Sequence, residues 1–466
     1  MRCMRRTPGS EKSVTAEARL MNSSVETSAS SKAAPRIPLF PEIGVVGLVP
    51  DKWDSPWTVR HHVMTRLGRY FQLVWVNPAP PWRDCWLGRS GLMSPSDVSR
   101  QPGFAVYNPG RLEAKFHRPV IVARAAERRR LAKARKTLTE RGCERIIVYL
   151  WRPEFGAALD LIEHEASCYH VDDEYSFSPT EQPTDEREIR LLKHADHVFI
   201  HSPALWAKKA AYNAGAHLIP TGADYRSFAA PRTEPADLRA VPRPRIGYVG
   251  YIKGQLDFPL IARLALAHRE WSFVFVGPQN ANMPRYASQL DALSRLPNVY
   301  MLGGRPVGEL PAYVQHMDVL TLGYRINDYT KFICPMKLNE YLASGRPVVG
   351  SPIPCLKLFS DVVALAETPE QWSAALTDAL RLAASSRRRV DQRRRVARQY
   401  DWGRIVLRIA WTICGSLGDY YVRRITEAHG PPPQFIGRGY DETTPAAAGA
   451  QIAATSTSQG GARRPQ

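Results

Sequence analysis

The fold is decided in the stretch CPMKLNEYLASGRPVVG, residues 334–350. It predicts a short helix, because Pro335 suits a first helical turn, where a missing N–H costs nothing. Gly345 suits the position just past the helix end, and Pro347 prevents any continuation. The two valines that follow begin a buried strand of the kind found in parallel sheets. The stretch therefore predicts a helix followed directly by a parallel strand, which is a unit of an α/β fold.

Two charged side chains suggest a chemical role for this helix. Lys337 and Glu340 lie three residues apart, so they share one helix face close to the N-terminus. A helix N-terminus favours anions, and a cation beside it suits a diphosphate. A carboxylate one turn later suits a ribose or sugar hydroxyl group. The pattern indicates a nucleotide-sugar site, although lysine and glutamate at this spacing are also common on any solvated helix face.

The composition is that of a globular protein with excess positive charge. The 466 residues suffice for two domains, and the apolar content of 44% and charged content of 23% are ordinary. The net charge of +19 favours an anionic partner, which could be nucleic acid, an acidic membrane surface or a phosphorylated substrate. We expect no nucleic-acid partner, because no nucleic-acid-binding signature accompanies the charge.

The cysteine pattern gives no sign of a disulfide framework or a zinc site. The count is odd, the spacing is scattered and no C-x-x-C motif occurs; the seven are Cys3, Cys85, Cys143, Cys168, Cys334, Cys355 and Cys414. Such usage is typical of a reducing cytoplasm. No apolar run approaches the roughly 18 residues that a membrane span needs, and no apolar core of a secretory signal follows the N-terminal basic residues.

Strands alternate with helices in two successive halves of the chain, which predicts two Rossmann-like, doubly wound parallel sheets. The ends of the chain are rich in small and polar residues, which predicts disordered tails. The predicted parts are a disordered tail (1–36), an N-terminal domain (37–230), a proline-rich linker (231–244), a C-terminal domain (245–400), a C-terminal helix that packs back toward the N-terminal domain (401–428) and a second disordered tail (429–466).

Several motifs within about residues 40–425 resemble those of the GT-B glycosyltransferases. They are ADHVFIHSP at 195–203 with IPTGADYRSF at 219–228, IGYVG at 246–250, FVGP at 275–278, residues 335–350 and YDW at 400–402. In this order they are similar to the bacterial group-1 enzymes of polysaccharide assembly, including teichuronic-acid and xanthan glucuronosyltransferase-like members. The resemblance implies metal-independent transfer of a hexose from a nucleoside diphosphate sugar on the C-terminal domain to an acceptor on the N-terminal domain.

The resemblance also implies which residues bind the donor. Lys337 would contact the diphosphate, and Glu340 the nucleotide ribose or the sugar. Met336 would lie near the base or ribose. Gly250 and Tyr251 would form the loop beneath the phosphates, where a glycine allows the backbone to approach closely. No metal ion and no cofactor are implied beyond the donor substrate, a UDP- or GDP-sugar.

One position departs from the retaining members of the family. Many of these have a second glutamate eight residues before Glu340, where this chain has Phe332. The difference favours an inverting or divergent enzyme. Inverting transfer needs a general base that takes the proton of the acceptor hydroxyl group.

The general base is predicted in YHVDDEY, residues 169–175, which follows a buried strand. Open α/β sheets bind ligands at the carboxyl ends of their strands, and clustered carboxylates raise one another's pKa. A similarly placed aspartate serves as base in xanthan-type relatives, so the resemblance favours Asp172 and then Asp173. A carboxylate that only caps a helix or lines a loop is the alternative. Other candidate bases are His170, His201 and His316.

Basic and aromatic residues of the first half favour a membrane surface as a partner. A predicted helix at 119–141 carries many arginines and lysines, and tryptophans lie beside basic residues within 53–57 and 80–86. Such surfaces suit an anionic bilayer and a lipid-linked acceptor, although a free saccharide acceptor is equally compatible. The expected location is the cytoplasm, peripheral to the inner face of the plasma membrane. A solvated basic helix with core tryptophans is the alternative.

These observations predict a glycosyltransferase of cell-envelope or exopolysaccharide synthesis. Two other functions are compatible with the same sequence. A sugar-nucleotide epimerase on this fold would group acids and bases around one bound sugar and would need no acceptor surface. A non-catalytic nucleotide-sugar-binding protein would keep the donor residues alone.

Overall fold

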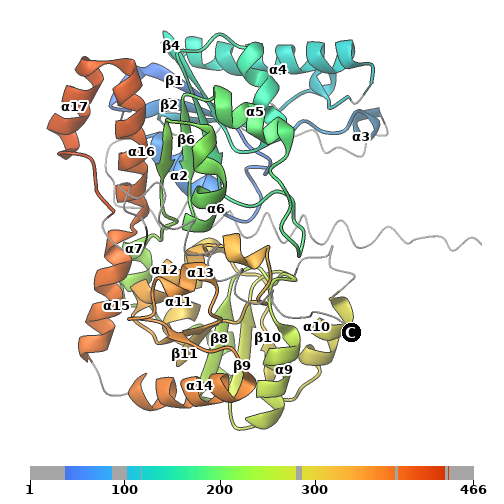
Figure 1. The fold of residues 1–466 in the computed structure, drawn as a ribbon, viewed down its shortest axis with the longest axis vertical. Helices are drawn as coiled ribbons and strands as arrows, with labels where there is room; N and C mark the ends of the chain where they lie inside the picture. Colours follow the sequence, from blue (N-terminus) through green and yellow to red (C-terminus); the bar gives the residue numbers. More distant parts are fainter. Residues whose placement is uncertain are drawn as a thin grey trace, which may run out of the picture.

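Two parallel sheets, each covered by helices, form an N-terminal and a C-terminal domain that lie one above the other (Figure 1). In the described residues the first sheet has the strand order β3-β2-β1-β4-β5-β6-β7, and the second has the order β10-β9-β8-β11-β12-β13. Every pairing between neighbouring strands of these sheets is parallel. The predicted fold of two doubly wound α/β domains is confirmed.

The structure is a computed structural model, and it describes residues 37–86, 102–116, 118–279, 286–383, 387–435 and 439. The predicted tail 1–36 lies outside the described residues, as does most of 429–466. None of the helices in the described part of the chain is both long and apolar enough to cross a bilayer.

The N-terminal domain contains seven strands within the described ranges, with helices on both faces of their sheet. The strands are β1 (Phe40–Leu48), β2 (Phe71–Val76), β3 (Phe104–Tyr107), β4 (Arg145–Leu150), β5 (Ala166–Val171), β6 (His197–Ile200) and β7 (Ala216–Leu218). The helices are α2 (Val59–Leu67), α3 (Trp82–Trp86), η1 (Arg111–Glu113), α4 (Val120–Thr139), η2 (Pro153–Asp160), α5 (Glu186–His194), α6 (Pro203–Lys209) and η3 (Ala210–Tyr212). Helix α7 (Tyr225–Ala229) follows β7 and packs on the core cluster of the C-terminal domain.

The C-terminal domain repeats this arrangement with a smaller sheet. Its strands are β8 (Arg245–Val249), β9 (Ser272–Val276), β10 (Val299–Met301), β11 (Val319–Leu322), β12 (Val348–Gly350) and β13 (Ala364–Leu365). Its helices are α8 (Ala236–Arg239), α9 (Phe258–Ala267), α10 (Ala287–Ser294), η4 (Val307–Glu309), α11 (Leu310–Gln315), η5 (Thr330–Phe332), α12 (Met336–Ser344), α13 (Pro354–Lys357), α14 (Pro369–Ala383) and α15 (Arg387–Gln399).

Apolar strands pack these sheets from both sides. Strand β1 lies between β2 and β4, and its residues from Ile43 to Leu48 are all but fully buried. Such continuous apolar runs are typical of parallel strands covered by helices on both faces. Gly47 of this strand allows helix α2 to approach, since a Cβ atom there would lie 2.2 Å from Cε of Met64.

The stretch 334–350 forms the predicted helix and strand. Helix α12 ends at Gly345, whose φ of 82° is a left-handed conformation that glycine adopts without strain. Strand β12 follows at once and pairs with β11. The predicted linker 231–244 differs from expectation, because it contains α8 and buries Leu238 and Val241 in the core of the C-terminal domain.

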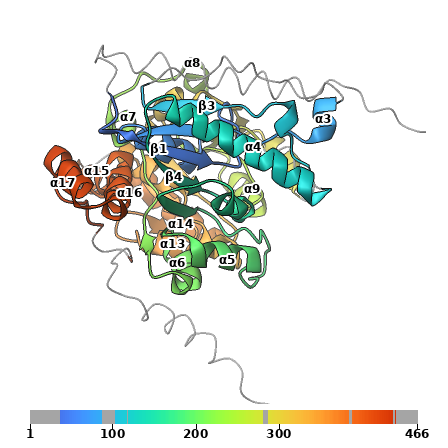
Figure 2. The same cartoon turned by 90° about the horizontal axis from the view of Figure 1, so that it is seen from above.

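Helix α16 (Trp402–Leu417) returns the chain from the C-terminal domain to the N-terminal domain (Figures 1 and 2). The side chain of Asp401 caps it by accepting a hydrogen bond from the Gly403 N–H. Its apolar face joins the core cluster of the N-terminal domain. The predicted single helix at 401–428 is in fact two, because Gly418 (φ 114°) separates α16 from α17 (Asp419–His429).

We expect Ile409→Ala to destabilise the N-terminal domain by about 2–4 kcal/mol, because the fully buried side chain leaves a cavity in its core. Urea unfolding followed by tryptophan fluorescence measures this change. Arg404→Ala on the exposed face of α16 is the matched control and should change the unfolding free energy by less than about 0.5 kcal/mol. Equal effects of the two substitutions would contradict the packing of α16 on this domain.

Candidate functional site

The loop after β8 and the start of α12 lie against each other. Gly250 has a φ of 142°, and a Cβ atom on it would come within 1.9 Å of Cε of Lys337. Gly277 has a φ of 152°, and a Cβ atom there would lie 2.0 Å from the carbonyl oxygen of Gly250. Only glycine fits at either position. The Lys337 ammonium group lies 5.6 Å from the centre of the Tyr248 ring. The structure thus brings the predicted Gly250 and Lys337 together.

Tyr251 and Lys253 continue this loop. The Tyr251 carbonyl accepts a hydrogen bond from the Tyr248 hydroxyl at 2.9 Å, and the Lys253 ammonium lies 5.5 Å from the centre of the Tyr251 ring. Desolvation, and then the charge of Lys337, lower the pKa of Lys253, whereas Asp173 raises it. Sequence analysis missed Lys253, although its position three residues after Gly250 was a usable signal.

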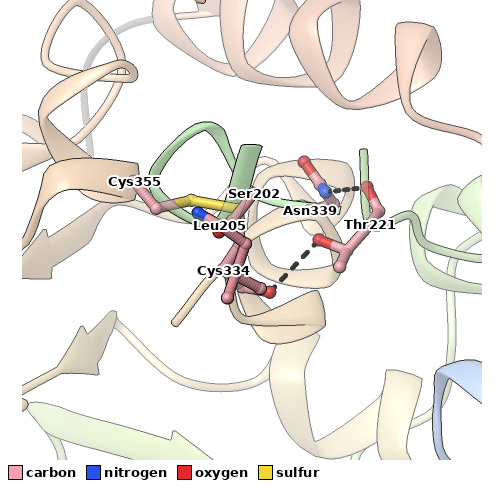
Figure 3. Close-up of a disulfide and its surroundings, with 6 residues drawn as sticks. All are labelled: Ser202, Leu205, Thr221, Cys334, Asn339 and Cys355. Carbon is pink, nitrogen blue, oxygen red and sulfur yellow. Dashed lines mark hydrogen bonds between the residues drawn. A yellow bond between two sulfur atoms is a disulfide. The ribbon is translucent and has the colours of Figure 1, made fainter. Parts of the chain in front are cut away.

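Helix α12 is fixed to both domains by its own polar side chains. The Tyr341 hydroxyl accepts a hydrogen bond from the Val249 N–H at 2.8 Å and donates one to the Val249 carbonyl at 3.0 Å. The Asn339 amide donates to the carbonyl of Thr221 in the N-terminal domain at 2.8 Å (Figure 3). The position of α12 relative to both β8 and the N-terminal domain is therefore set by hydrogen bonds.

Met336 and Glu340 occupy different environments on this helix. Met336 is partly buried and packs against the core cluster of the N-terminal domain. Burial raises the pKa of Glu340 to about 7, against the opposing effect of Lys337; Asp224 of the N-terminal domain raises it further. Near neutral pH the Glu340 carboxyl group is therefore partly protonated and can donate as well as accept a hydrogen bond.

A disulfide joins Cys334 and Cys355 beside α12, with the Cα atoms 5.5 Å apart (Figure 3). The scattered spacing of the cysteines, which argued against a disulfide framework, gave no indication of this pair. The two residues are 21 positions apart in sequence and meet because β12 and the turn after it fold the start of α13 back to the start of α12. Sequence spacing cannot show a contact that tertiary packing creates.

The two aspartates predicted as base candidates differ in their partners. Asp172 lies in a buried ion pair: Nη2 of Arg60 is 2.9 Å from its Oδ2 and 3.0 Å from its Oδ1. The Tyr175 hydroxyl donates to the same carboxylate at 3.0 Å, and Arg60 also binds Asp51 at 2.7 Å. The lone pairs of Asp172 are therefore largely occupied by neighbouring donors.

Asp173 instead faces the C-terminal domain. The Tyr329 hydroxyl of that domain lies 3.1 Å from both of its carboxylate oxygens. Burial raises the pKa of Asp173 to about 6, and the charge of Asp172 raises it further; the Glu174 N–H, Lys253 and Tyr329 oppose this. An acid with this pKa is a carboxylate at neutral pH and holds a proton well enough to act as a base.

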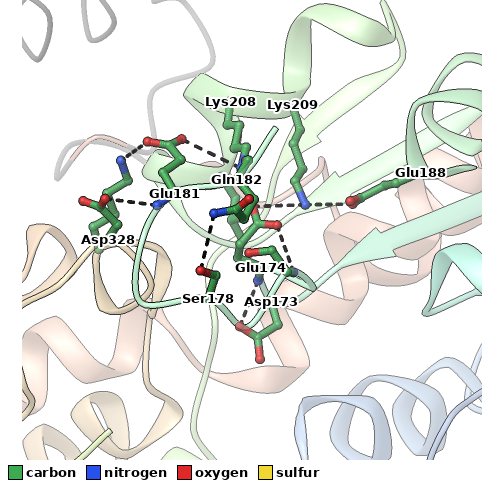
Figure 4. A network of polar contacts seen from close by, with 12 residues as sticks. Asp173, Glu174, Ser178, Glu181, Gln182, Glu188, Lys208, Lys209 and Asp328 are labelled. Carbon is green, nitrogen blue, oxygen red and sulfur yellow. Dashed lines mark hydrogen bonds and ion pairs between the residues drawn. The ribbon is translucent and has the colours of Figure 1, made fainter. Parts of the chain in front are cut away.

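The loop that carries Asp173 is held from both sides (Figure 4). In the N-terminal domain, Glu174 pairs with Lys208 at 3.0 Å and with Lys209 at 3.5 Å. Toward the C-terminal domain, the Glu181 N–H donates to Asp328 at 3.0 Å, and the Glu181 carboxylate pairs with Lys331. Glu174 is thus a structural residue, and the loop bridges the two domains beside Asp173.

The remaining predicted positions, which are Phe332 and three histidines, have contacts that indicate a structural role. Phe332, at the place of the second glutamate of retaining enzymes, is buried in an apolar cluster of the N-terminal domain, with the Lys208 ammonium 5.1 Å from its ring centre. Burial lowers the pKa of both His170 and His201, and the Tyr149 hydroxyl lies 2.9 Å from Nδ1 of His170. Nε2 of His316 lies 2.9 Å from the carbonyl oxygen of Arg232.

We expect Glu340→Gln to stabilise the protein at pH 8 by about 1–3 kcal/mol and to have little effect at pH 5. The folded-state pKa of about 7 is above the ordinary glutamate pKa of 4.5, so Glu340 contributes stability that is lost as the pH rises through 7. Thermal unfolding at both pH values measures the difference. The exposed control Glu309→Gln should not show this dependence, and a pH-independent effect of Glu340→Gln would contradict the assignment.

The comparisons with known proteins connect this chain with glycosyltransferases. Residues 243–382 match the family described as "Glycosyl transferases group 1". The "Putative teichuronic acid biosynthesis glycosyltransferase TuaH" of Bacillus subtilis (strain 168) is 33% identical over 175 residues, which are 36% of this chain and 43% of that protein. The chain therefore matches less than half the length of this curated relative.

Two solved structures share the arrangement of both domains. Alr3699/HepE of Anabaena in complex with UDP has a TM-score of 0.58 at 15% identity, over 80% of this chain and 100% of that one. An E. coli structure described as trehalose-6-phosphate bound with UDP-2-fluoro glucose has a TM-score of 0.56 at 13% identity, over 78% and 97% of the two chains. At such identities the likeness shows the fold alone. Residues 243–382 are therefore similar to the group 1 glycosyltransferases, and the two domains share the GT-B fold of these structures.

Proposed function

We propose that this protein is a glycosyltransferase that moves a hexose from a nucleoside diphosphate sugar to a lipid-linked or other saccharide acceptor. The proposal rests on charged residues that lie on the two sides of the domain boundary. Asp173, a carboxylate with a raised pKa, lies on one side, and Lys337 and Lys253 lie on the other, near the loop at Gly250 and the N-terminus of α12. Asp173 would supply a base, and the two lysines would neutralise a leaving diphosphate.

The donor would bind the C-terminal domain with its diphosphate at the start of α12. The backbone at Gly250 can approach a phosphate closely, and the Lys337 and Lys253 ammonium groups supply two positive charges. These cations could take the charge-neutralising role that a metal ion has in other transferases, which supports a metal-independent reaction. UDP and UDP-sugars in the structural neighbours favour a uridine donor over GDP-sugars.

In the proposed reaction, Asp173 removes the proton of an acceptor hydroxyl group as that oxygen attacks the anomeric carbon. The bond from that carbon to the diphosphate oxygen breaks at the same time, and the leaving negative charge develops beside Lys337. We place the base at Asp173 rather than Asp172, because Arg60 and Tyr175 occupy the carboxylate of Asp172. Phe332 offers no carboxylate, which is consistent with inversion.

The relation to TuaH supports a role in cell-envelope or exopolysaccharide synthesis. Lipid-linked acceptors of such pathways lie in a membrane, so we place the protein in the cytoplasm at the inner face of the plasma membrane. Incubating the protein with UDP- and GDP-sugars, with and without lipid-linked and soluble acceptors, tests the proposal. Acceptor-dependent release of the nucleotide supports transfer, whereas an epimeric donor or binding without turnover supports the two alternative functions.

We expect Asp173→Asn to lower kcat by about 10²–10⁴-fold without changing the affinity for the donor, because only the base is lost. Asp172→Asn keeps a side chain that can accept from Arg60 and should lower kcat less. For both variants, single-turnover kinetics measure the rate of the chemical step, and calorimetric titration measures the affinity for the donor. A larger loss with Asp172→Asn would move the base to that residue, and parental kcat in both variants would refute the mechanism.

The pH profile should report the same carboxylate. Because the pKa of Asp173 is about 6, kcat/KM should fall as the pH drops through about 6, where the base becomes protonated. Tyr329→Phe removes a donor that stabilises the carboxylate, so the acidic limb should move to higher pH. An acidic limb that persists in Asp173→Asn would assign the titration to another group.

Lys337→Met should weaken binding of UDP by about 10- to 100-fold, since a charge-assisted contact to phosphate is lost while the apolar stem over Tyr248 is kept. Isothermal titration calorimetry measures the change. The exposed Lys357→Met on α13 is the control and should bind UDP like the parent. Unchanged affinity in Lys337→Met would place the diphosphate elsewhere.

A further inference from the structure

Exposed apolar side chains gather at one rim of the N-terminal domain, away from the β6 and β7 edge of its sheet. They come from α3, η1 and the first turn of α4 and form what we call the rim patch. Its members, with exposed fractions, are Trp82 (37%), Leu112 (70%), Val120 (65%), Ile121 (81%) and Val122 (41%). Exposed apolar side chains that gather on neighbouring elements in this way are typical of interaction sites.

The rim patch surrounds a hollow of about 980 Å³ between the same three elements. Trp82 of α3, Leu112 of η1 and Val122 of α4 line it together with Phe116. The first two turns of α4 contribute no buried side chain before Ala126, so this end of the helix is not needed for packing on the sheet. Figure 2 shows α4 running across the domain toward α3. The apolar side chains at this end of α4 are therefore available to contact a partner outside the protein.

The charge around the rim patch is positive. Arg111, Arg128 and Arg129 line the hollow, and Arg118 and Arg124 are exposed beside it. Two of the acidic groups nearby are already paired. Glu113 is buried and binds Lys133, with Arg129 3.8 Å away, and Glu127 lies 3.8 Å from Arg130. The solvent-facing charge is thus carried mainly by arginines.

A surface in which arginines surround protruding apolar side chains fits one kind of partner, which must offer both negative charge and an apolar interior. An anionic bilayer offers phosphates to the guanidinium groups and hydrocarbon to the valine, isoleucine and leucine side chains. A soluble anion would use the arginines but leave the apolar tips in water. We propose that the rim patch is a docking surface for an anionic lipid bilayer. This deepens the proposed function by locating the membrane contact, and docking itself requires no transfer reaction.

Flotation of the full chain with lipid vesicles tests the docking surface. Vesicles of phosphatidylcholine with 30% phosphatidylglycerol should bind the protein, and pure phosphatidylcholine vesicles should bind at least about tenfold more weakly. Binding to the anionic vesicles should also fall as salt is raised from 0.05 to 0.5 M, roughly, because screening weakens the arginine contacts.

Two variants separate the contributions of charge and apolar contact. Arg124→Glu/Arg128→Glu and Ile121→Ser/Val122→Ser should each lower binding to anionic vesicles at least about tenfold, and both should fold because their side chains are exposed. The matched controls are Arg388→Glu/Arg395→Glu on α15 and Leu266→Ser on α9, which should bind like the parent.

Three results would overturn the proposal: no binding of the parent chain to anionic vesicles, equal loss in the control variants, or self-association in ultracentrifugation that only the rim-patch variants abolish. The last would assign the patch to a second copy of the chain. Calorimetric binding of UDP should be unchanged in the rim-patch variants. Failure of the parent to bind either UDP or GDP would refute the proposed function and leave the vesicle result standing.

Discussion

The contact between Gly250 and Lys337 is the constraint on which the candidate site depends. Because the glycine has no side chain, the stem of Lys337 can lie against the backbone at the end of β8. Gly277 meets the Gly250 carbonyl in the same way from β9. The carboxyl ends of two neighbouring strands and the start of α12 thereby converge, with a cation at their centre. A Cβ atom at either glycine would force them apart.

The second decisive interaction is the ion pair of Arg60 with Asp172. Because of this ion pair, Asp172 has a structural role, whereas the adjacent Asp173 faces the C-terminal domain. Adjacent residues at a strand end point in different directions, so their chemistry can differ although their sequence context is the same. The negative charge of Asp172 also raises the pKa of Asp173, which favours the proposed role of Asp173 as a base.

The domain boundary is held by polar contacts from several elements. Asn339 binds the Thr221 carbonyl, Tyr329 binds Asp173, and the loop around Glu181 reaches Asp328 and Lys331. Helix α16 adds an apolar anchor on the N-terminal domain. These contacts fix the distance between Asp173 and the loop after β8, which is the geometry that the proposed transfer between two substrates requires.

The sequence by itself determined the two parallel sheets and α12 with its glycine end. These features follow from local periodicity and from residues whose backbone preferences are strong, such as Pro335 and Gly345. The placement of Gly250 and Lys337 in one site was implied by the resemblance of the motifs to those of GT-B enzymes. Only the tertiary structure decided the different partners of Asp172 and Asp173, the contact of Tyr329 with Asp173, and the Cys334–Cys355 pair. Those contacts join residues far apart in sequence, and burial and neighbouring charge set their chemistry, so no local pattern could have revealed them.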